Sequence, residues 1–141
     1  MKMPEETPTP GHNGNSLELV DLAEILNVRV QELGPEHPDT LQSRHSMAVG
    51  FFNLGRVQDA VWLNEETLRI RERVLGAEHP DTLHSRNALA SGYYHLGRVV
   101  EAVWHYEETL ITRERVLGSE HPDTTHSRDV LDAAYRSLGS N

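Results

Sequence analysis

The sequence lacks cysteine, an excess of basic charge and any long apolar run, and each absence excludes a class of protein. Without cysteine there is no disulfide, no thiol chemistry and no zinc–thiolate site. The net charge of −9 disfavours nucleic acid and anionic membrane surfaces as partners. No apolar stretch approaches the ~18 residues of a membrane span. The N-terminus also lacks an apolar leader, so we expect a cytoplasmic protein without membrane contact.

The chain is also poor in apolar residues, which make up 37% of its 141 residues. Residues 1–15 are rich in proline and polar side chains, and they contain almost nothing apolar. Such a segment cannot offset the entropy lost on ordering, so we expect it to be disordered. The folded domain is then expected over residues 16–139.

One phrase occurs three times, at a fixed spacing of 42 residues. It reads LGPEHPDTLQSR from Leu33, LGAEHPDTLHSR from Leu75 and LGSEHPDTTHSR from Leu117. Self-similarity at such a period predicts a solenoid, in which each unit buries apolar surface against its neighbours. The repeats are expected at 33–74, 75–116 and 117–139, after a half repeat at 16–32.

Glycine and proline divide the chain into six predicted helices. A glycine after each long apolar-periodic segment ends a helix, and a proline two residues after each Glu of the repeated phrase begins the next. His37, His79 and His121 lie in this connector, where we expect them to pack under the loop. The helices are predicted at 17–33 (capped by Asn15 or Ser16), 38–54, 57–75, 80–96, 99–117 and 122–138.

Two consecutive segments resemble a known family. NALASGYYHLGR, from Asn87, resembles helix A and the turn of a tetratricopeptide repeat, and VVEAVWHYEETL, from Val99, resembles its helix B. The period of 42 and the connector are similar to the kinesin-light-chain type. The resemblance implies an all-α, right-handed α-solenoid with helices in the order B-A-B-A-B-A. It also implies a protein-interaction scaffold, not an enzyme, that needs no cofactor.

The resemblance further implies a concave groove, lined by the A helices, that binds a peptide or a partner helix. Family geometry centres this site on Asn87, Ser91, Tyr94 and His95. Of the paired asparagines that hold a peptide backbone in the family, only Asn87 is kept, because Ala88 replaces the second. The candidate binding residues are His45, Phe52, Asn53, His84, Asn87, Ser91, Tyr94, His95 and Arg136.

A second hypothesis is self-assembly. Val20, Trp62 and Trp104 share one position on the B helices, where they either pack between neighbouring helices or form an exposed apolar stripe. Glu18 and Asp132 replace alanines of the other copies, which predicts polar caps, a nearly complete domain and a monomer. The alternative is a homo-oligomer, formed head to tail through the two end helices or side by side through the stripe.

Other side chains receive structural roles. Phe51, Tyr93 and Tyr135 are predicted to point into the core, and Leu54, Leu96 and Leu138 to close the same face. The recurring arginines are expected to pair with carboxylates of the preceding B helix. The nine histidines lack the spacing of metal ligands, so we predict no metal site. The expected ion pairs are Arg44, Arg86 and Arg128 with Glu32, Glu72 and Glu114.

Overall fold

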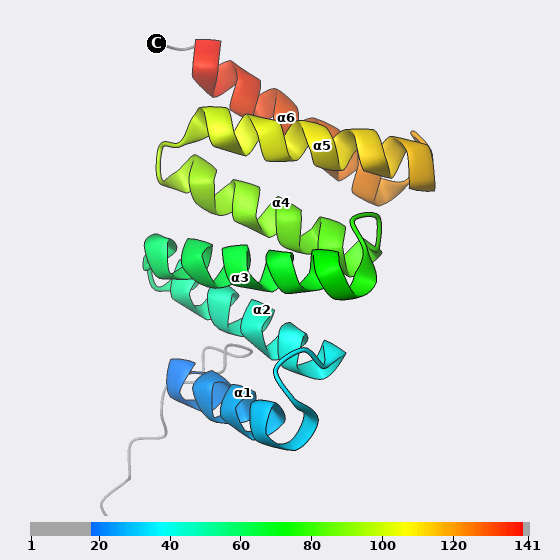
Figure 1. Ribbon diagram of the computed structural model, residues 1–141. Helices are drawn as coiled ribbons and strands as arrows, with labels where there is room; N and C mark the ends of the chain where they lie inside the picture. Colours follow the sequence, from blue (N-terminus) through cyan, green and yellow to red (C-terminus); the bar gives the residue numbers. More distant parts are fainter. Residues whose placement is uncertain (1–17, 140–141) are drawn as a thin grey trace, which may run out of the picture.

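The computed structural model describes residues 18–139, and all six predicted helices are present in that range. Figure 1 shows them stacked in chain order, from α1 at one end to α6 at the other, as a helical solenoid. Each helix packs against its neighbours in the chain. The predicted cap at Asn15 or Ser16, the start at Leu17 and the disordered segment 1–15 lie outside the described residues. The bounds are α1 Leu19–Leu33, α2 Pro38–Asn53, α3 Val57–Leu75, α4 Pro80–His95, α5 Val99–Leu117 and α6 Pro122–Gly139.

Glycines with positive φ end the helices, as the sequence predicted. Gly76 follows α3 with φ of 91°, and Gly97 follows α4 with φ of 81°. Side chains rarely adopt this left-handed backbone conformation, so glycine is needed for the chain to reverse there. The A helices (α2, α4, α6) and the B helices (α1, α3, α5) therefore alternate in the predicted order, with bounds close to those predicted from the sequence.

The connector histidines cap the A helices, which corrects the prediction that they pack under the loop. The Nδ1 atom of His79 accepts a hydrogen bond from the backbone N–H of Asp81 at 3.1 Å. His37 and His121 make the same bond to Asp39 and Asp123. The following proline has no N–H to satisfy, so each A helix begins without an unpaired donor at these positions.

Each joint between a B helix and the next A helix contains an arginine whose role the sequence reasoning missed. On α3, Arg71 Nη1 donates to Ser85 Oγ at 2.8 Å and to the carbonyl oxygen of Asp81 at 3.2 Å. Arg71 is only 3% exposed, and burial lowers the pKa of its guanidinium. A buried charge needs such partners. The bond to serine recurs at 2.7 Å in the pairs Arg29–Ser43 and Arg113–Ser127.

The recurring arginines of the A helices form ion pairs, two of which are those predicted. Arg86 pairs with Glu72 at 2.8 Å, and Arg128 pairs with Glu114 at 3.3 Å. Arg44 does not pair with Glu32 and instead reaches Glu66 on α3 at 3.2 Å. The reason is the register of α1, in which Val30 lies where the other copies have Glu72 and Glu114.

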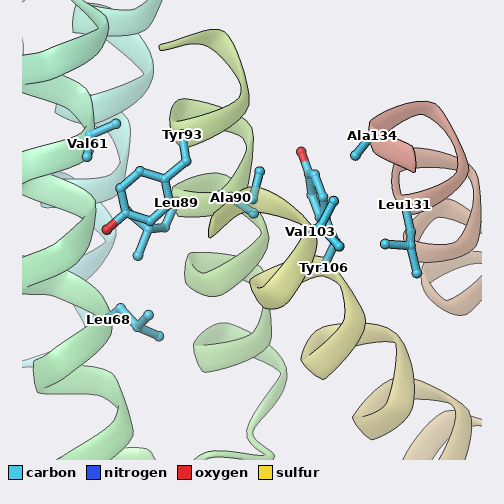
Figure 2. Close-up of a cluster of buried hydrophobic side chains, with 10 residues drawn as sticks. Val61, Leu68, Leu89, Ala90, Tyr93, Val103, Tyr106, Leu131 and Ala134 are labelled. Atoms are coloured by element: carbon cyan, nitrogen blue, oxygen red, sulfur yellow. The ribbon is translucent and has the colours of Figure 1, made fainter. Parts of the chain in front are cut away.

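The core runs through the middle of the solenoid, between α3 and α6. Figure 2 shows Tyr106 between the side chains of Ala90 and Ala134, with Val61 and Leu68 of α3 on the other side of α4. Ala48, Ala60, Ala90 and Ala102 are at most 2% exposed, as small residues must be where helices approach closely.

Several residues predicted to lie in the core are exposed, at the ends of the solenoid and at the ends of A helices. Tyr93 is 7% exposed, whereas its copy Tyr135 is 45% exposed on α6, where no further helix follows in the described residues. Leu54 and Leu138 do not close the core face, since they are 65% and 40% exposed at the ends of their helices. Glu18 and Asp132 are both exposed. Burial would have cost these carboxylates their hydration.

Candidate functional site

The A helices contact one another directly through side chains that differ from copy to copy. On α2 and α4, the Nε2 atoms of His45 and His84 are 3.2 Å apart, and the two rings meet edge to face. Desolvation, helped by the neighbouring His84 and by Arg71, lowers the pKa of His45 to about 4. The pKa of His84 is also lowered, mainly by burial. Both rings are therefore neutral near pH 7, and one N–H donates to the other ring.

A second row of contacts lies about two to three helical turns further along the A helices. The Phe52 ring meets the His95 ring edge to face, with centroids 4.7 Å apart. In the next copy, the Tyr94 hydroxyl and the Ser137 hydroxyl are 2.6 Å apart. His95 Nδ1 lies 2.7 Å from the carbonyl oxygen of Ser91. We call the surface around these contacts and the histidine pair the inner face, and we define it by the A-helix residues His45, Phe52, His84, Asn87, Ser91, Tyr94 and His95.

A pocket of about 150 Å³ opens in the inner face at the junction of α2, α3 and α4. Its walls combine apolar side chains with three polar ones, and no lining side chain is ionised near pH 7. Asn64, from α3, is 6% exposed and was not among the predicted site residues. The lining residues are His45, Ala48, Val49, Phe52, Asn64, Ala88 and Ser91.

The structure thus brings several predicted site residues together and leaves others apart. His45, Phe52 and Ser91 share the pocket. Asn87 is half-buried on α4, and its Oδ1 atom is buried without a hydrogen-bond partner among the described residues. Asn53 and Arg136 are exposed and line none of the described pockets.

The proposed stripe on the B helices is exposed. Val20 is 74%, Trp62 73% and Trp104 55% exposed, so these side chains do not pack between neighbouring B helices. Trp104 is the more covered tryptophan, because its ring meets that of His105 edge to face and lies 6.0 Å from the Arg86 guanidinium. The interpretation of the tryptophans as inter-helix packing residues was therefore wrong.

Within residues 18–139, no group of three or more His, Cys, Asp or Glu side chains is placed to hold a metal ion. None of the helices in that range is long and apolar enough to cross a membrane.

The geometry of alternating helix pairs joined by repeated connectors can be compared with known proteins. A sequence model described as Tetratricopeptide repeat matches residues 40–81 and 82–123. The chain belongs to the tetratricopeptide repeat family. This family consists of non-catalytic scaffolds that typically bind proteins or peptides. No curated protein matches this tetratricopeptide repeat chain.

Two solved structures place the repeats near the kinesin light chains. Both are of a candidate kinesin light chain from Podosopora anserina with nearly identical TPR-like repeats, one of them a single-residue variant. They are 35% identical to this chain, with TM-scores of 0.81 and 0.80, respectively, for the unsubstituted protein and the variant. The alignment covers 86% of this chain and 57% of theirs, so the chain spans little more than half their length.

A more distant structure, BtubC (BKLC) from P. vanneervenii, has the same fold. It is 21% identical, with a TM-score of 0.78, over 86% of this chain and 48% of that one. The tetratricopeptide repeats of this chain are therefore of the kinesin-light-chain-like type that the 42-residue period indicated.

Proposed function

We propose that this chain binds a peptide segment or a partner helix across its inner face. One observation supports this most directly. The contacts among the A helices change from copy to copy, whereas the arginine–serine joints behind them are identical in all three copies. A constant scaffold under a variable surface is what a recognition module needs. The contacts we propose are His45, Phe52, Asn53, His84, Asn87, Ser91, Tyr94, His95 and Arg136.

The chemistry of the inner face suits an uncharged stretch of polypeptide. His45 and His84 are neutral near pH 7, because burial lowers the pKa of both rings. Repulsion from His84 adds to this at His45, and repulsion from Arg71 and Arg113 adds to it at His84. The buried Oδ1 atom of Asn87 has no donor within the described residues. A buried acceptor left without a donor is costly, and a backbone N–H of a bound peptide would satisfy it. The side chains of Tyr94 and His95 lie next to each other on the same face.

A selected peptide gives the test of this proposal. A random peptide library is displayed and selected on the immobilised protein, and affinities for a selected peptide are measured by fluorescence anisotropy. The double variant Asn87→Ala/Tyr94→Ala is expected to weaken binding by about tenfold or more, since each substitution removes a polar contact. The matched control, Trp62→Ala/Trp104→Ala, removes two aromatic rings from the other face and should bind as the unaltered protein does. Equal binding by both double variants would rule out the inner face.

A second candidate function is self-association through the B helices. The observation that favours it is the exposure of Val20, Trp62 and Trp104, which form a possible side-by-side contact. Against head-to-tail association, Glu18 and Asp132 would lose hydration on packing of α1 against α6. We propose a monomer, with side-by-side association through the stripe as the alternative.

Light scattering over a range of concentrations measures the mass of the particle. A mass that rises with concentration, and that falls on Trp62→Ala/Trp104→Ala substitution, would favour association through the stripe. The cytoplasmic location expected from the sequence stays a prediction.

A further inference from the structure

The pocket of the inner face has an equivalent place one repeat later, where a tyrosine side chain is buried. It lies between α2, α3 and α4, and its equivalent one repeat later would lie between α4, α5 and α6. Two positions account for the difference. Asn64 of the pocket corresponds to Tyr106 in the next repeat, and Ala88 corresponds to Val130. At both positions the pocket has the smaller side chain.

Tyr106 shows what fits in such a space. Its side chain is 5% exposed and belongs to the buried cluster that includes Ala90 and Ala134, as Figure 2 shows. Its side chain lies close to Ser91, and burial raises the pKa of its hydroxyl. Ser91 is the copy of Val49, which lines the pocket. The tyrosine ring therefore lies in the space that stays open one repeat earlier.

The lining of the pocket also limits what can enter it. The groups there are apolar carbons, a serine hydroxyl, the Asn64 amide and the His45 imidazole. Because His45 is neutral near pH 7, no ionised side chain lines the pocket, and a charged end group would lose its hydration there without an ion partner. The volume of about 150 Å³ suits a single ring. A ring is also stiff, so that fixing it costs little conformational entropy.

We propose that this pocket receives the aromatic side chain of a phenylalanine or tyrosine from a bound polypeptide, in the place that the Tyr106 ring fills one repeat later. The proposal rests on the function proposed above and specifies it, because it names the side chain that anchors the peptide. The Asn64 amide and the Ser91 hydroxyl supply hydrogen-bond partners for a phenol, while Phe52 and Val49 contact the ring.

The pocket can be tested without any peptide. Para-cresol, the side chain of tyrosine, is titrated into the full chain, and amide and methyl signals are followed by NMR. The expected result is saturable binding in the millimolar range, with the largest shifts at Val49, Ala88 and Ser91. Butylamine, which resembles the lysine side chain, is the charged control and should cause no saturable shift at these residues.

Variants that borrow residues from the chain's own copies separate this pocket from other sites. Asn64→Tyr introduces the ring present in the next repeat and should weaken cresol binding by about tenfold or more. Asn64→Ala removes one hydrogen-bond partner of the phenol but leaves the space for its ring, so it should weaken cresol binding clearly less. If Asn64→Tyr fails to fold by circular dichroism, Ala88→Val, which introduces the residue type of Val130, replaces it. Cresol shifts that lie elsewhere, or that persist in the filling variant, would overturn the proposal.

The outcome for the pocket can be told apart from the outcome for the inner face. In one outcome, a selected peptide binds the Asn87→Ala/Tyr94→Ala variant more weakly but binds the Asn64→Tyr variant as tightly as the unaltered protein. This outcome would leave the inner face as the binding surface and refute the aromatic anchor. An inner face that binds no selected peptide would refute the proposed function, and the polypeptide ligand of the pocket with it. The aromatic anchor is supported only if both cresol and the selected peptide bind the Asn64→Tyr variant more weakly than the unaltered protein.

Discussion

The joints between repeats have the same residue types in every copy, whereas the inner face has different ones. At the three joints, an arginine donates to a serine hydroxyl at 2.7, 2.8 and 2.7 Å, and the residue types are identical each time. On the inner face, the copies of one position are His45, Asn87 and Asp129, and those of another are Phe52, Tyr94 and Arg136.

The physical reason for this difference is the cost of burial. Arg71 is 3% exposed, so its charge needs both acceptors in place, and loss of the Ser85 hydroxyl would leave its guanidinium with one acceptor fewer. The residues of the inner face are mostly half-buried or exposed, and many combinations of side chains satisfy them. The joint therefore fixes the 42-residue step, while the inner face is free to differ.

The largest expected effect comes from breaking a joint. Arg71→Ala removes the donor to Ser85 and to the Asp81 carbonyl and leaves a cavity where the aliphatic stem packed. We expect a loss of about 3 kcal/mol in the free energy of unfolding, measured by urea denaturation. Arg69→Ala, on the exposed side of the same helix, is the control and should change it by less than about 0.5 kcal/mol. Equal losses for the two variants would show that the joint does not hold the repeats together.

A smaller effect is expected where α3 and α4 approach closely. A Cβ atom at Gly92 would lie 2.5 Å from Cγ2 of Val61, which is fully buried. Gly92→Ala should therefore destabilise the fold by about 2 kcal/mol, although alanine is the better helix former. At Gly50 the corresponding neighbours are the flexible ends of Leu19 and Leu22, at 2.9 and 3.1 Å. Gly50→Ala should cost clearly less, and a reversed order in thermal melts would refute the packing argument.

The histidine pair of the inner face should make the free energy of unfolding depend on pH. His45 has a folded pKa of about 4, below its ordinary 6.5, because burial and the adjacent His84 disfavour the charged ring. The unfolded chain therefore binds the proton first as pH falls. The contribution of the neutral His45 ring to the free energy of unfolding is complete above about pH 6.5 and is lost progressively toward pH 4.

At about pH 5.5 the loss should be about 1 kcal/mol relative to pH 7. His45→Asn introduces the residue that Asn87 supplies in the next copy, and it should remove this part of the pH dependence in urea titrations. His37→Asn is the control, since that ring caps a helix and is not part of the histidine pair. If the free energy of unfolding of His45→Asn depends on pH as strongly as that of the unaltered protein, the neutral histidine pair does not exist in solution.

The smallest expected effect is at the centre of the inner face. The Oδ1 atom of Asn87 is buried and has no partner in the described part of the chain, so Asn87→Ala breaks no hydrogen bond of that atom and removes the cost of an unpaired buried acceptor. We expect the free energy of unfolding to stay the same or rise, and to fall by no more than about 0.5 kcal/mol. A loss as large as that of Arg71→Ala would mean that Asn87 is structural, and would remove the contrast between joint and inner face.

Most of the fold was predictable from the sequence because its determinants are local. Glycines and prolines at a fixed spacing set the helix ends, and small residues such as Ala48 and Ala90 set the close contacts. The ion pair of Arg44 was predicted wrongly, because the substitution of Val30 for a glutamate shifts its partner to α3. For the tryptophans the sequence left both packing and exposure open, since one sequence position does not reveal how far neighbouring B helices stand apart.

The candidate site was less predictable because it depends on three helices at once. Asn64 lies on a B helix, at a position occupied by Leu22 and Tyr106 in the other copies. The pocket there needs this small side chain together with walls from both α2 and α4. The buried arginines were missed because charged residues on a helix usually face solvent. Their recurrence with a serine fourteen residues later was the available indication.

The most direct test of the inner face is an NMR titration with a selected peptide that follows side chains on both faces together. We predict saturable shifts of the His45, Tyr94 and His95 ring signals, while the indole N–H signals of Trp62 and Trp104 stay unchanged. Saturable shifts of the two indoles, with constant ring signals on the A helices, would contradict the assignment of recognition to the inner face.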